Sequence, residues 1–181
     1  MSDAPAADET AAPEEEAAPP PPPEKYGLLL TESRGQTCLH VARESLADHV
    51  LRLRDDEGFT VCIDVTAVDY LAYNAARALP PGIEPERFEV VVSLLSHTKV
   101  ERVRLRVQVP VNDPVVPSLF DVHPGTEAME REVFDLFGIR FDGHPDLSRI
   151  LMPEDWIGHP LRKDYAIGRI PVQFKGVEDA R

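Results

Sequence analysis

The chain has 181 residues, a formal net charge of −13 and two cysteines. A chain of this length supports one domain of ordinary size, and its acidic balance leaves no electrostatic footprint for nucleic acid or for an anionic membrane surface. The cysteines, Cys38 and Cys62, are too few for a disulfide scaffold or for the thiolates of an ordinary iron–sulfur cluster, and they suit a reducing compartment.

Residues 1–24 are an Ala/Glu/Pro tract that ends in the proline run Pro19–Pro23. They contain seven acidic side chains and no basic one, so they carry −7 of the net charge and leave −6 for the rest. Such a segment cannot bury enough apolar surface to offset the entropy lost on ordering. We therefore expect a disordered acidic tail that serves as a spacer or solubilising arm. A proline-rich ligand for another domain is the alternative.

Five β-prone runs follow, at residues 26–30, 37–41, 59–70, 88–95 and 100–109. The first two flank a Ser-Arg-Gly turn signal and predict a hairpin. Run 88–95 is nearly continuous in apolar residues, as expected for a central strand covered on both faces. Run 100–109 alternates strictly between apolar and polar residues, which indicates one wet face.

A helix is predicted between the second and third of these runs. Residues 42–56 place Leu46, Val50, Leu51 and Leu53 at roughly helical spacing, and Gly58 lies just beyond them. The order of strands and helices indicates an α+β fold, with a mostly antiparallel sheet and helices packed on one face.

Residues 126–137 are predicted to form a second amphipathic helix. Its apolar residues share one side: Met129, Val133, Leu136 and Phe137. Thr126 can serve as N-cap, and Gly138 stands where a left-handed C′ residue belongs. The opposite side carries what we interpret as an i, i+4 ladder of surface charges: Glu127, Arg131 and Asp135.

Glu130 and Glu132 lie at the two rims of the apolar side of this helix. A carboxylate pressed against apolar groups stays neutral or takes a cationic partner, because an unpaired buried charge costs several kcal/mol. The nearest candidate cations in the sequence are Arg140, Arg149, Arg162 and Lys163. The alternative is that both glutamates reach out to water.

Residues 138–181 are rich in Pro, Gly and charge and have little periodicity. Gly143-His144-Pro145 recurs as Gly158-His159-Pro160, and each copy leads into a leucine and basic residues. We therefore divide the chain into a disordered tail at 1–24, an α+β domain at 25–137 and an irregular extended segment at 138–181.

Motifs for chemistry are scarce. The sequence has no G-x-G-x-x-G, phosphate loop or H-E-x-x-H. One constellation of metal-ligand residue types is present: His123, His144 and His159 with Asp142, Asp146, Asp155 and Asp164. It could compose a zinc or iron site, which leaves a stand-alone metal hydrolase as a remote alternative. Its spacing matches no helix-borne metal motif, and a His before a Pro in a turn is more often packed or hydrogen-bonded.

The sequence offers no membrane span or targeting segment. No window approaches the ~18 consecutive apolar residues of a span. The N-terminus lacks the basic and hydrophobic regions of a secretory signal and the Arg-rich character of a transit peptide. We expect the protein to remain in the cytosol where it is made.

The stretch EREVFDLFGIRFDGHPDLSRILMPEDWIGHPLRKDY, residues 130–165, resembles the signature region of the 30 kDa subunit family, the C subunits of bacterial respiratory complex I, NADH:quinone oxidoreductase. Residues 64–70, 87–96 and 116–125 are also similar to that family, so the resemblance covers about residues 36–174. The chain departs from the family's pattern at Ser148, where many relatives carry a base, and at Ala128-Met129, where an aromatic is common.

The resemblance implies a cofactor-free, non-catalytic subunit in the peripheral arm of this proton-translocating enzyme. It implies a role beside the large quinone-site subunit and neighbouring iron–sulfur subunits, with FMN and iron–sulfur clusters held by those partners. It also implies that the assembly passes electrons from NADH to a quinone such as ubiquinone. The expected location is peripheral, on the cytoplasmic side of the bacterial cell membrane, and no catalytic, cofactor-binding or metal residue is expected here.

The resemblance also assigns partner-interface or signature residues: Glu130, Arg131, Glu132, Asp135, Gly138, His144, Pro145, Arg149, His159, Pro160, Arg162, Lys163 and Asp164. Residues 138–174 are then expected to clamp the large subunit, with Arg149, Arg162 and Lys163 meeting its acidic groups or the carboxylates of Glu130 and Glu132. The alternatives are the equivalent subunit of a membrane-bound hydrogenase or another electron-input dehydrogenase, and an adaptor that recruits partners through its polyproline arm.

Overall fold

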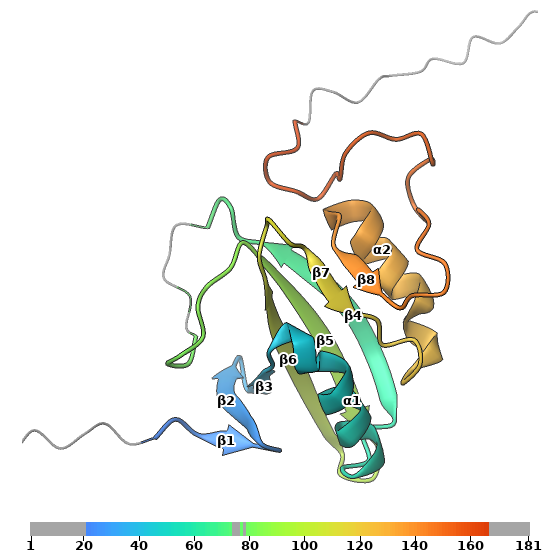
Figure 1. Ribbon diagram of the computed structural model, residues 1–181. Helices are drawn as coiled ribbons and strands as arrows, with labels where there is room; N and C mark the ends of the chain where they lie inside the picture. The colour runs from blue at the N-terminus through green and yellow to red at the C-terminus, as the bar shows by residue number, and fades with distance from the viewer. Residues whose placement is uncertain (1–20, 74–76, 78, 167–181) are drawn as a thin grey trace, which may run out of the picture.

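The computed structural model describes residues 21–73, 77 and 79–166 and confirms an α+β fold (Figure 1). The tail expected at 1–24 lies outside the described residues up to residue 20, and so does the end of the C-terminal segment from residue 167. No helix in the described part of the chain is long and apolar enough to cross a bilayer.

Six strands form one sheet in the order β1-β2-β3-β6-β5-β4. In chain order they are β1 (Glu24–Lys25), β2 (Leu28–Ser33), β3 (Gln36–His40), β4 (Val61–Asp69), β5 (Phe88–Ser96) and β6 (Glu101–Val109). Neighbouring strands are antiparallel except β3 and β6, which pair in parallel. The predicted hairpin is therefore confirmed as β2 and β3, whereas β1 and the parallel contact were not predicted.

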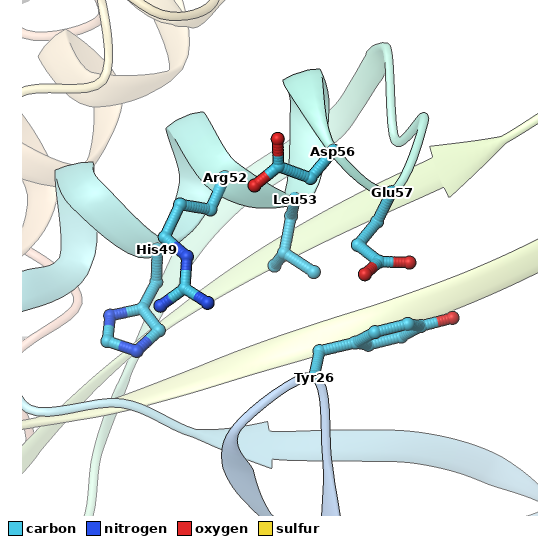
Figure 2. A pocket seen from close by; sticks show the side chains of 6 residues that line it. All are labelled: Tyr26, His49, Arg52, Leu53, Asp56 and Glu57. Atoms are coloured by element: carbon cyan, nitrogen blue, oxygen red, sulfur yellow. The ribbon is translucent and has the colours of Figure 1, made fainter.

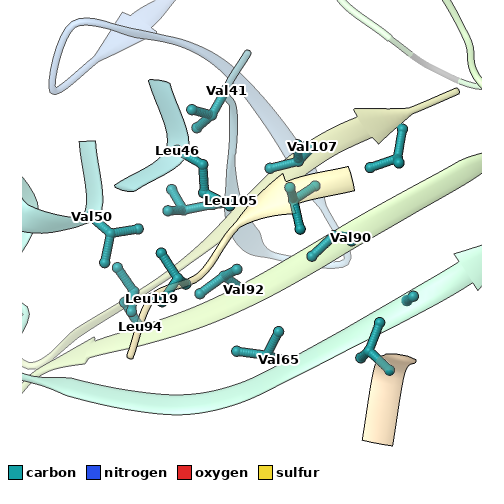
Figure 3. Packing of buried hydrophobic residues seen from close by; sticks show 14 of the residues in the cluster. Val41, Leu46, Val50, Val65, Val90, Val92, Leu94, Leu105, Val107 and Leu119 are labelled. Carbon is teal, nitrogen blue, oxygen red and sulfur yellow. The ribbon is translucent and has the colours of Figure 1, made fainter. Parts of the chain in front are cut away.

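Both helices cover the same face of the sheet. A short 3-10 turn (Arg43–Ser45) leads into α1 (Leu46–Asp55), and another (Pro124–Thr126) leads into α2 (Glu127–Phe137). Val90, Val92 and Leu94 of β5 point toward Leu46 and Val50 of α1 (Figure 3). All five are fully buried, and each such side chain contributes roughly 1.5–3 kcal/mol of transfer free energy.

The other face of β5 differs from the prediction. Its residues Val91, Ser93 and Leu95 are half-buried, so β5 is fully covered on one face. In the neighbouring strand β6 the prediction of one buried and one wetter face is confirmed, because Val103 is buried and Arg102 is exposed.

A second, two-stranded sheet was also not predicted. β7 (Val115–Pro117) pairs in parallel with β8 (Arg140–Asp142), on either side of α2 in the sequence. The Arg140 N–H donates to the Pro114 carbonyl, and the Ser118 N–H donates to the Asp142 carbonyl. This pairing brings together the segments that precede and follow α2, and it fixes where the C-terminal segment begins.

The ends of α2 follow the sequence only in part. Gly138 has φ of 73° and occupies the left-handed C-cap position, as predicted. Thr126 stands at the N-cap position, but its backbone is right-handed and its side chain caps no backbone N–H. Its hydroxyl donates to Glu130 instead, so the predicted side-chain cap is wrong.

Candidate functional site

Residues 143–166, which we call the C-terminal segment, contain neither helix nor strand. In Figure 1 the segment leaves β8, runs past α2 and returns toward the end of the sheet. Most of the signature residues named from the sequence lie in this segment or in the part of α2 beside it. The contacts between the two therefore define the candidate site.

Asp135 is the centre of these contacts. It is fully buried, and one carboxylate oxygen accepts three successive backbone N–H groups, from Ile150 (3.1 Å), Leu151 (2.8 Å) and Met152 (2.8 Å). The other oxygen accepts a hydrogen bond from Arg149 and completes an ion pair. Burial acts to raise the pKa of Asp135, but the Met152 N–H, the Arg149 guanidinium and the other two N–H groups outweigh it and hold the pKa below its ordinary value.

Arg149 extends this anchor along the segment. One terminal nitrogen donates both to the carboxylate and to the main-chain carbonyl of Asp135. The other donates to the carbonyls of Trp156 (2.9 Å) and Gly158 (3.0 Å). A single guanidinium thus joins α2 to two later turns of the C-terminal segment, which uses the planar donor geometry that arginine offers and lysine does not.

The carbonyls at the C-terminal end of α2 are also bound by the segment. His159 Nδ1 donates to the Asp135 carbonyl (2.9 Å), the Leu161 N–H to that of Leu136 (3.0 Å) and Arg162 Nε to that of Phe137. These carbonyls lack partners within the helix, and the negative end of the helix dipole favours a cation such as Arg162. Burial lowers the pKa of His159, which keeps its ring neutral.

Gly138 leaves the space that His159 and Arg162 occupy. A Cβ on this residue would lie 2.5 Å from His159 Nε2 and 2.6 Å from Arg162 Nη2. Glycine is therefore needed here for two reasons, the left-handed backbone and the close approach of the segment.

A second anchor ties the segment to the sheet. Asp69, at the end of β4, accepts two hydrogen bonds from Arg87 and one from the Lys163 N–H (2.9 Å). Arg87 also donates twice to Asp164, so it lies between two carboxylates. Burial acts to raise the pKa of Asp69, but Arg87 and the Lys163 N–H hold it below its usual range. The predicted signature residues Lys163 and Asp164 thus meet the sheet rather than α2.

Glu130 does not pair with the basic residues, and this part of the prediction is wrong. It is fully buried, and its carboxylate accepts hydrogen bonds from the Ser118 hydroxyl (2.6 Å), the Leu119 N–H (2.8 Å) and the Thr126 hydroxyl (2.9 Å). These neutral donors satisfy the carboxylate without a cation. Glu132, the other candidate, is exposed.

Asp135 is the residue that sequence reasoning placed wrongly, because it was assigned to a ladder of surface charges. Of that ladder, the structure keeps a 3.4 Å contact between Glu127 and Arg131. Arg131 otherwise donates to the Ser148 hydroxyl and to the carbonyls of Ser148 and Arg149. Ser148 thus binds an arginine of α2.

The remaining signature residues lie at the two ends of α2. His144 Nε2 lies 3.1 Å from the Glu127 carbonyl, near the start of the helix, and Pro145 follows it in an exposed turn. Pro160 lies between His159 and Leu161 at the other end. The structure therefore brings these residues together along one helix rather than around one point.

The histidines and aspartates of the possible metal site are not gathered. His144 and His159 bind carbonyls at opposite ends of α2, and Asp164 is engaged by Arg87. Residues 21–73, 77 and 79–166 contain no group of three or more His, Cys, Asp or Glu side chains that could hold a metal ion.

A small cavity lies away from α2 and the C-terminal segment. Figure 2 shows Tyr26 of the β1–β2 turn facing the last turns of α1, and the remaining lining residues are His49, Arg52, Leu53, Asp56 and Glu57. The Tyr26 ring packs edge-on against Phe59, and its hydroxyl donates to Glu101. These contacts close one end of the core, and no signature residue lines this cavity.

Four large aliphatic side chains of the C-terminal segment are exposed: Ile150 (40%), Leu151 (59%), Ile157 (90%) and Leu161 (45%). The main chain beside them is held by Asp135, Arg149 and the end of α2. The segment thus presents aliphatic groups to the outside from a backbone that is held in place.

Comparisons with known proteins agree with this signature. The family model described as "Respiratory-chain NADH dehydrogenase, 30 Kd subunit" matches residues 39–170. The C subunit of NADH-quinone oxidoreductase from Saccharopolyspora erythraea is 46% identical over 153 residues, which are 83% of this chain and 57% of that protein. The protein of that name from Salinispora arenicola is 45% identical over 147 residues, 80% of this chain and 56% of its own length. The chain spans little more than half the length of these relatives.

Two solved structures share the fold. A trypsin-resistant fragment of Nqo5 is 35% identical with a TM-score of 0.59, and the match covers 67% of this chain and 90% of the fragment. A chain of the membrane-bound sulfane sulfur reductase, an archaeal respiratory membrane complex, is 22% identical with a TM-score of 0.57 and matches 85% of this chain and 90% of its own, which shows the fold alone. The family match runs from the end of β3 through β4, β5, β6 and α2 to the anchored C-terminal segment, and this chain therefore belongs to the 30 kDa subunit family of the respiratory-chain NADH dehydrogenase.

Proposed function

We propose that the chain is a cofactor-free structural subunit of the peripheral arm of a proton-translocating NADH:quinone oxidoreductase. It supports the large quinone-site subunit, while neighbouring subunits hold the FMN and iron–sulfur clusters that carry electrons from NADH to quinone. The proposal includes a peripheral location on the cytoplasmic side of the bacterial cell membrane. Its support is the family and the names of the relatives.

The observation that carries the proposal is the anchored C-terminal segment with its exposed aliphatic side chains. A segment that is already ordered loses little conformational entropy when a partner binds, so the burial of Leu151 and Ile157 contributes more fully to affinity. We propose residues 138–174 as a clamp on the large subunit, of which residues 138–166 are described. The clamp is anchored by Asp135 and Asp69, and not by Glu130 or Glu132 as the sequence suggested.

The test is purification of the tagged subunit from its native membrane in mild detergent. The expected preparation contains flavin and iron–sulfur centres and reduces quinone with NADH. Leu151→Ser combined with Ile157→Ser is expected to lose the copurifying large subunit, because both side chains are exposed on the segment. Val111→Ser is the matched control, since Val111 is 49% exposed and lies outside the segment. Recovery of a lone, active subunit would contradict the proposal.

A second candidate is the equivalent subunit of a related electron-input complex, such as a membrane-bound hydrogenase. The shared fold of the archaeal sulfane sulfur reductase chain favours keeping it. Nickel in the purified assembly, with no flavin, identifies this candidate. The adaptor hypothesis for the polyproline arm is tested in that preparation, where deletion of residues 1–24 is expected to leave the assembly active.

A further inference from the structure

The sheet has a second face, opposite α1 and α2, that no described helix covers. Because side chains alternate along a strand, the buried residues Val103, Leu105 and Val107 of β6 put Arg102, Arg104 and Arg106 on this face. Tyr70 and Arg77 cover its end near Glu89. The part around Ser93, Leu95 and Arg104 is half-exposed.

The arginines on this face are not equally satisfied. Arg106 donates two hydrogen bonds to the buried carboxylate of Glu89. The side chains of Arg102 and Arg104 make no hydrogen bond or ion pair with any residue in the described part of the chain. The same holds for the side chain of Arg34, which is exposed in the β2–β3 turn at the same end of the sheet. We call Arg34, Arg102 and Arg104 the arginine patch.

Few acidic side chains in the described domain lie close enough to balance the positive charge of the arginine patch. The strand register places Arg104, Ser93 and Asp64 in one row, so Asp64 lies two strands, or about 10 Å, from Arg104. Half-buried apolar side chains, Val68, Val91 and Leu95, share the face. Such a surface suits an occupant that is acidic and carries small apolar residues.

Residues 1–20 have this chemistry. They contain six acidic residues and no basic one, and the rest of the tract is mostly alanine and proline. A segment whose charge is opposite to that of the arginine patch is thus already attached to the domain. Attachment by a short linker gives an effective concentration in the millimolar range, which allows weak contacts to be occupied.

The point where these residues join the domain lies on the same sheet. The Leu30 N–H donates to the Pro23 carbonyl (2.8 Å), and Glu24 pairs with Leu29 at the β2 side. Because the sheet order runs β2-β3-β6, Arg104 lies about 10 Å from β2. Glu16 lies seven positions before Pro23, and a chain of that length reaches at most about 25 Å.

We infer that residues 1–20 dock on the second face of the sheet, with their carboxylates on the arginine patch and their alanines and prolines over Val91 and Leu95. Each exposed ion pair contributes only about 0.2–1 kcal/mol, so docking depends on several pairs and weakens with salt. This contact is separate from the clamp proposed at the C-terminal segment, which lies beside α2.

Carbodiimide coupling in the full chain tests the inference, because it joins a carboxylate to a nearby lysine amine. In Arg104→Lys, mass spectrometry is expected to find the introduced lysine joined to Glu14, Glu15 or Glu16. The control is Arg140→Lys, an exposed position on β8, where the yield of joined peptide is expected to be about fivefold lower. Circular dichroism of both variants checks that they fold like the parent chain.

Two further arms separate the possible occupants. Adding 0.5 M NaCl is expected to reduce the product at position 104 to the level of the control, because salt screens the ion pairs. Equal yields in Arg104→Lys and Arg140→Lys overturn the inference, because they indicate a tail with no preferred site. It is also overturned if the lysine introduced at position 104 couples to a carboxylate of another subunit in the purified assembly, since the face then belongs to that subunit.

Discussion

Asp135 and Arg149 form a buried ion pair that joins the last turn of α2 to the C-terminal segment. The carboxylate side of this pair also accepts three backbone N–H groups, so its charge is fully compensated away from water. Asp135 is fully buried, and the Arg149 side chain is 15% exposed. A pair in this setting is costly to break from one side, because the remaining partner is a buried charge without compensation.

Asp135→Asn is therefore expected to lower the free energy of unfolding by roughly 3–5 kcal/mol. The amide keeps the size of the side chain but removes its charge and turns an NH₂ group toward backbone donors. Urea denaturation followed by circular dichroism measures the change. The matched control is Glu132→Gln on the exposed side of the helix, which is expected to stay within about 0.5 kcal/mol of the parent.

The two acidic residues of α2 are expected to differ in their coupling to the basic segment. A double-mutant cycle of Asp135→Asn with Arg149→Met is expected to give an interaction energy above about 1 kcal/mol, because the two groups touch. The cycle of Glu130→Gln with Arg162→Met is expected to give less than about 0.5 kcal/mol, since Glu130 binds Ser118, Leu119 and Thr126. A large Glu130–Arg162 coupling would restore the pairing suggested by the sequence.

The positions of Asp135 and Glu130 along the predicted helix, relative to its dipole, could have indicated which of them needs a cationic partner. Asp135 lies two residues from the C-terminal end of α2, where an acidic side chain is unfavourable unless a cation compensates it. Glu130 lies in the first turn, where unpaired N–H groups and the dipole already favour an acid. Helical periodicity alone assigned Asp135 to the surface, because it does not reveal what covers a helix from outside.

Strand positions and the buried face of the sheet were predictable because each depends on a short window of residues. The parallel pairing of β3 with β6 was not, since these strands are separated in the sequence by α1, β4 and β5. The β7–β8 pair and the course of the C-terminal segment were unpredictable for the same reason. Both are fixed by contacts across α2, such as that of Arg140 with Pro114, which leave no periodic pattern.

Gly138 is expected to tolerate no side chain. Gly138→Ala must accept a left-handed backbone, which costs about 1–2 kcal/mol, and must also displace His159 and Arg162, which adds about 1–3 kcal/mol. Gly35→Ala is the matched control, because Gly35 has φ of 71° with no atom within 4 Å of the added carbon. The difference in unfolding free energy between the two variants measures the steric contact alone. Equal losses would show that the segment can move away at no cost.

Stability is expected to fall with acid in two steps. Burial lowers the pKa of His159, so near pH 6 the unfolded chain, with an ordinary histidine pKa of about 6.5, binds more protons than the folded one. His40, whose pKa falls to about 4, and His123 act in the same direction. The stability from these neutral rings is complete above the unfolded pKa and is lost as pH falls toward the folded values. Asp69 and Asp135, whose pKa values also lie below their ordinary range, add a second loss at lower pH.

His159→Gln is expected to flatten the first step, because glutamine can donate to the Asp135 carbonyl but does not gain a charge. The measurement is the difference in unfolding free energy between pH 7.5 and pH 5.0, from urea denaturation at each pH. His97→Gln, an exposed position in the β5–β6 turn, is the control and is expected to leave that difference unchanged. A larger difference in His159→Gln than in the parent would mean that the ring is protonated in the folded state. The hydrogen bond from His159 to the end of α2 would then be that of a cation, with the opposite dependence on pH.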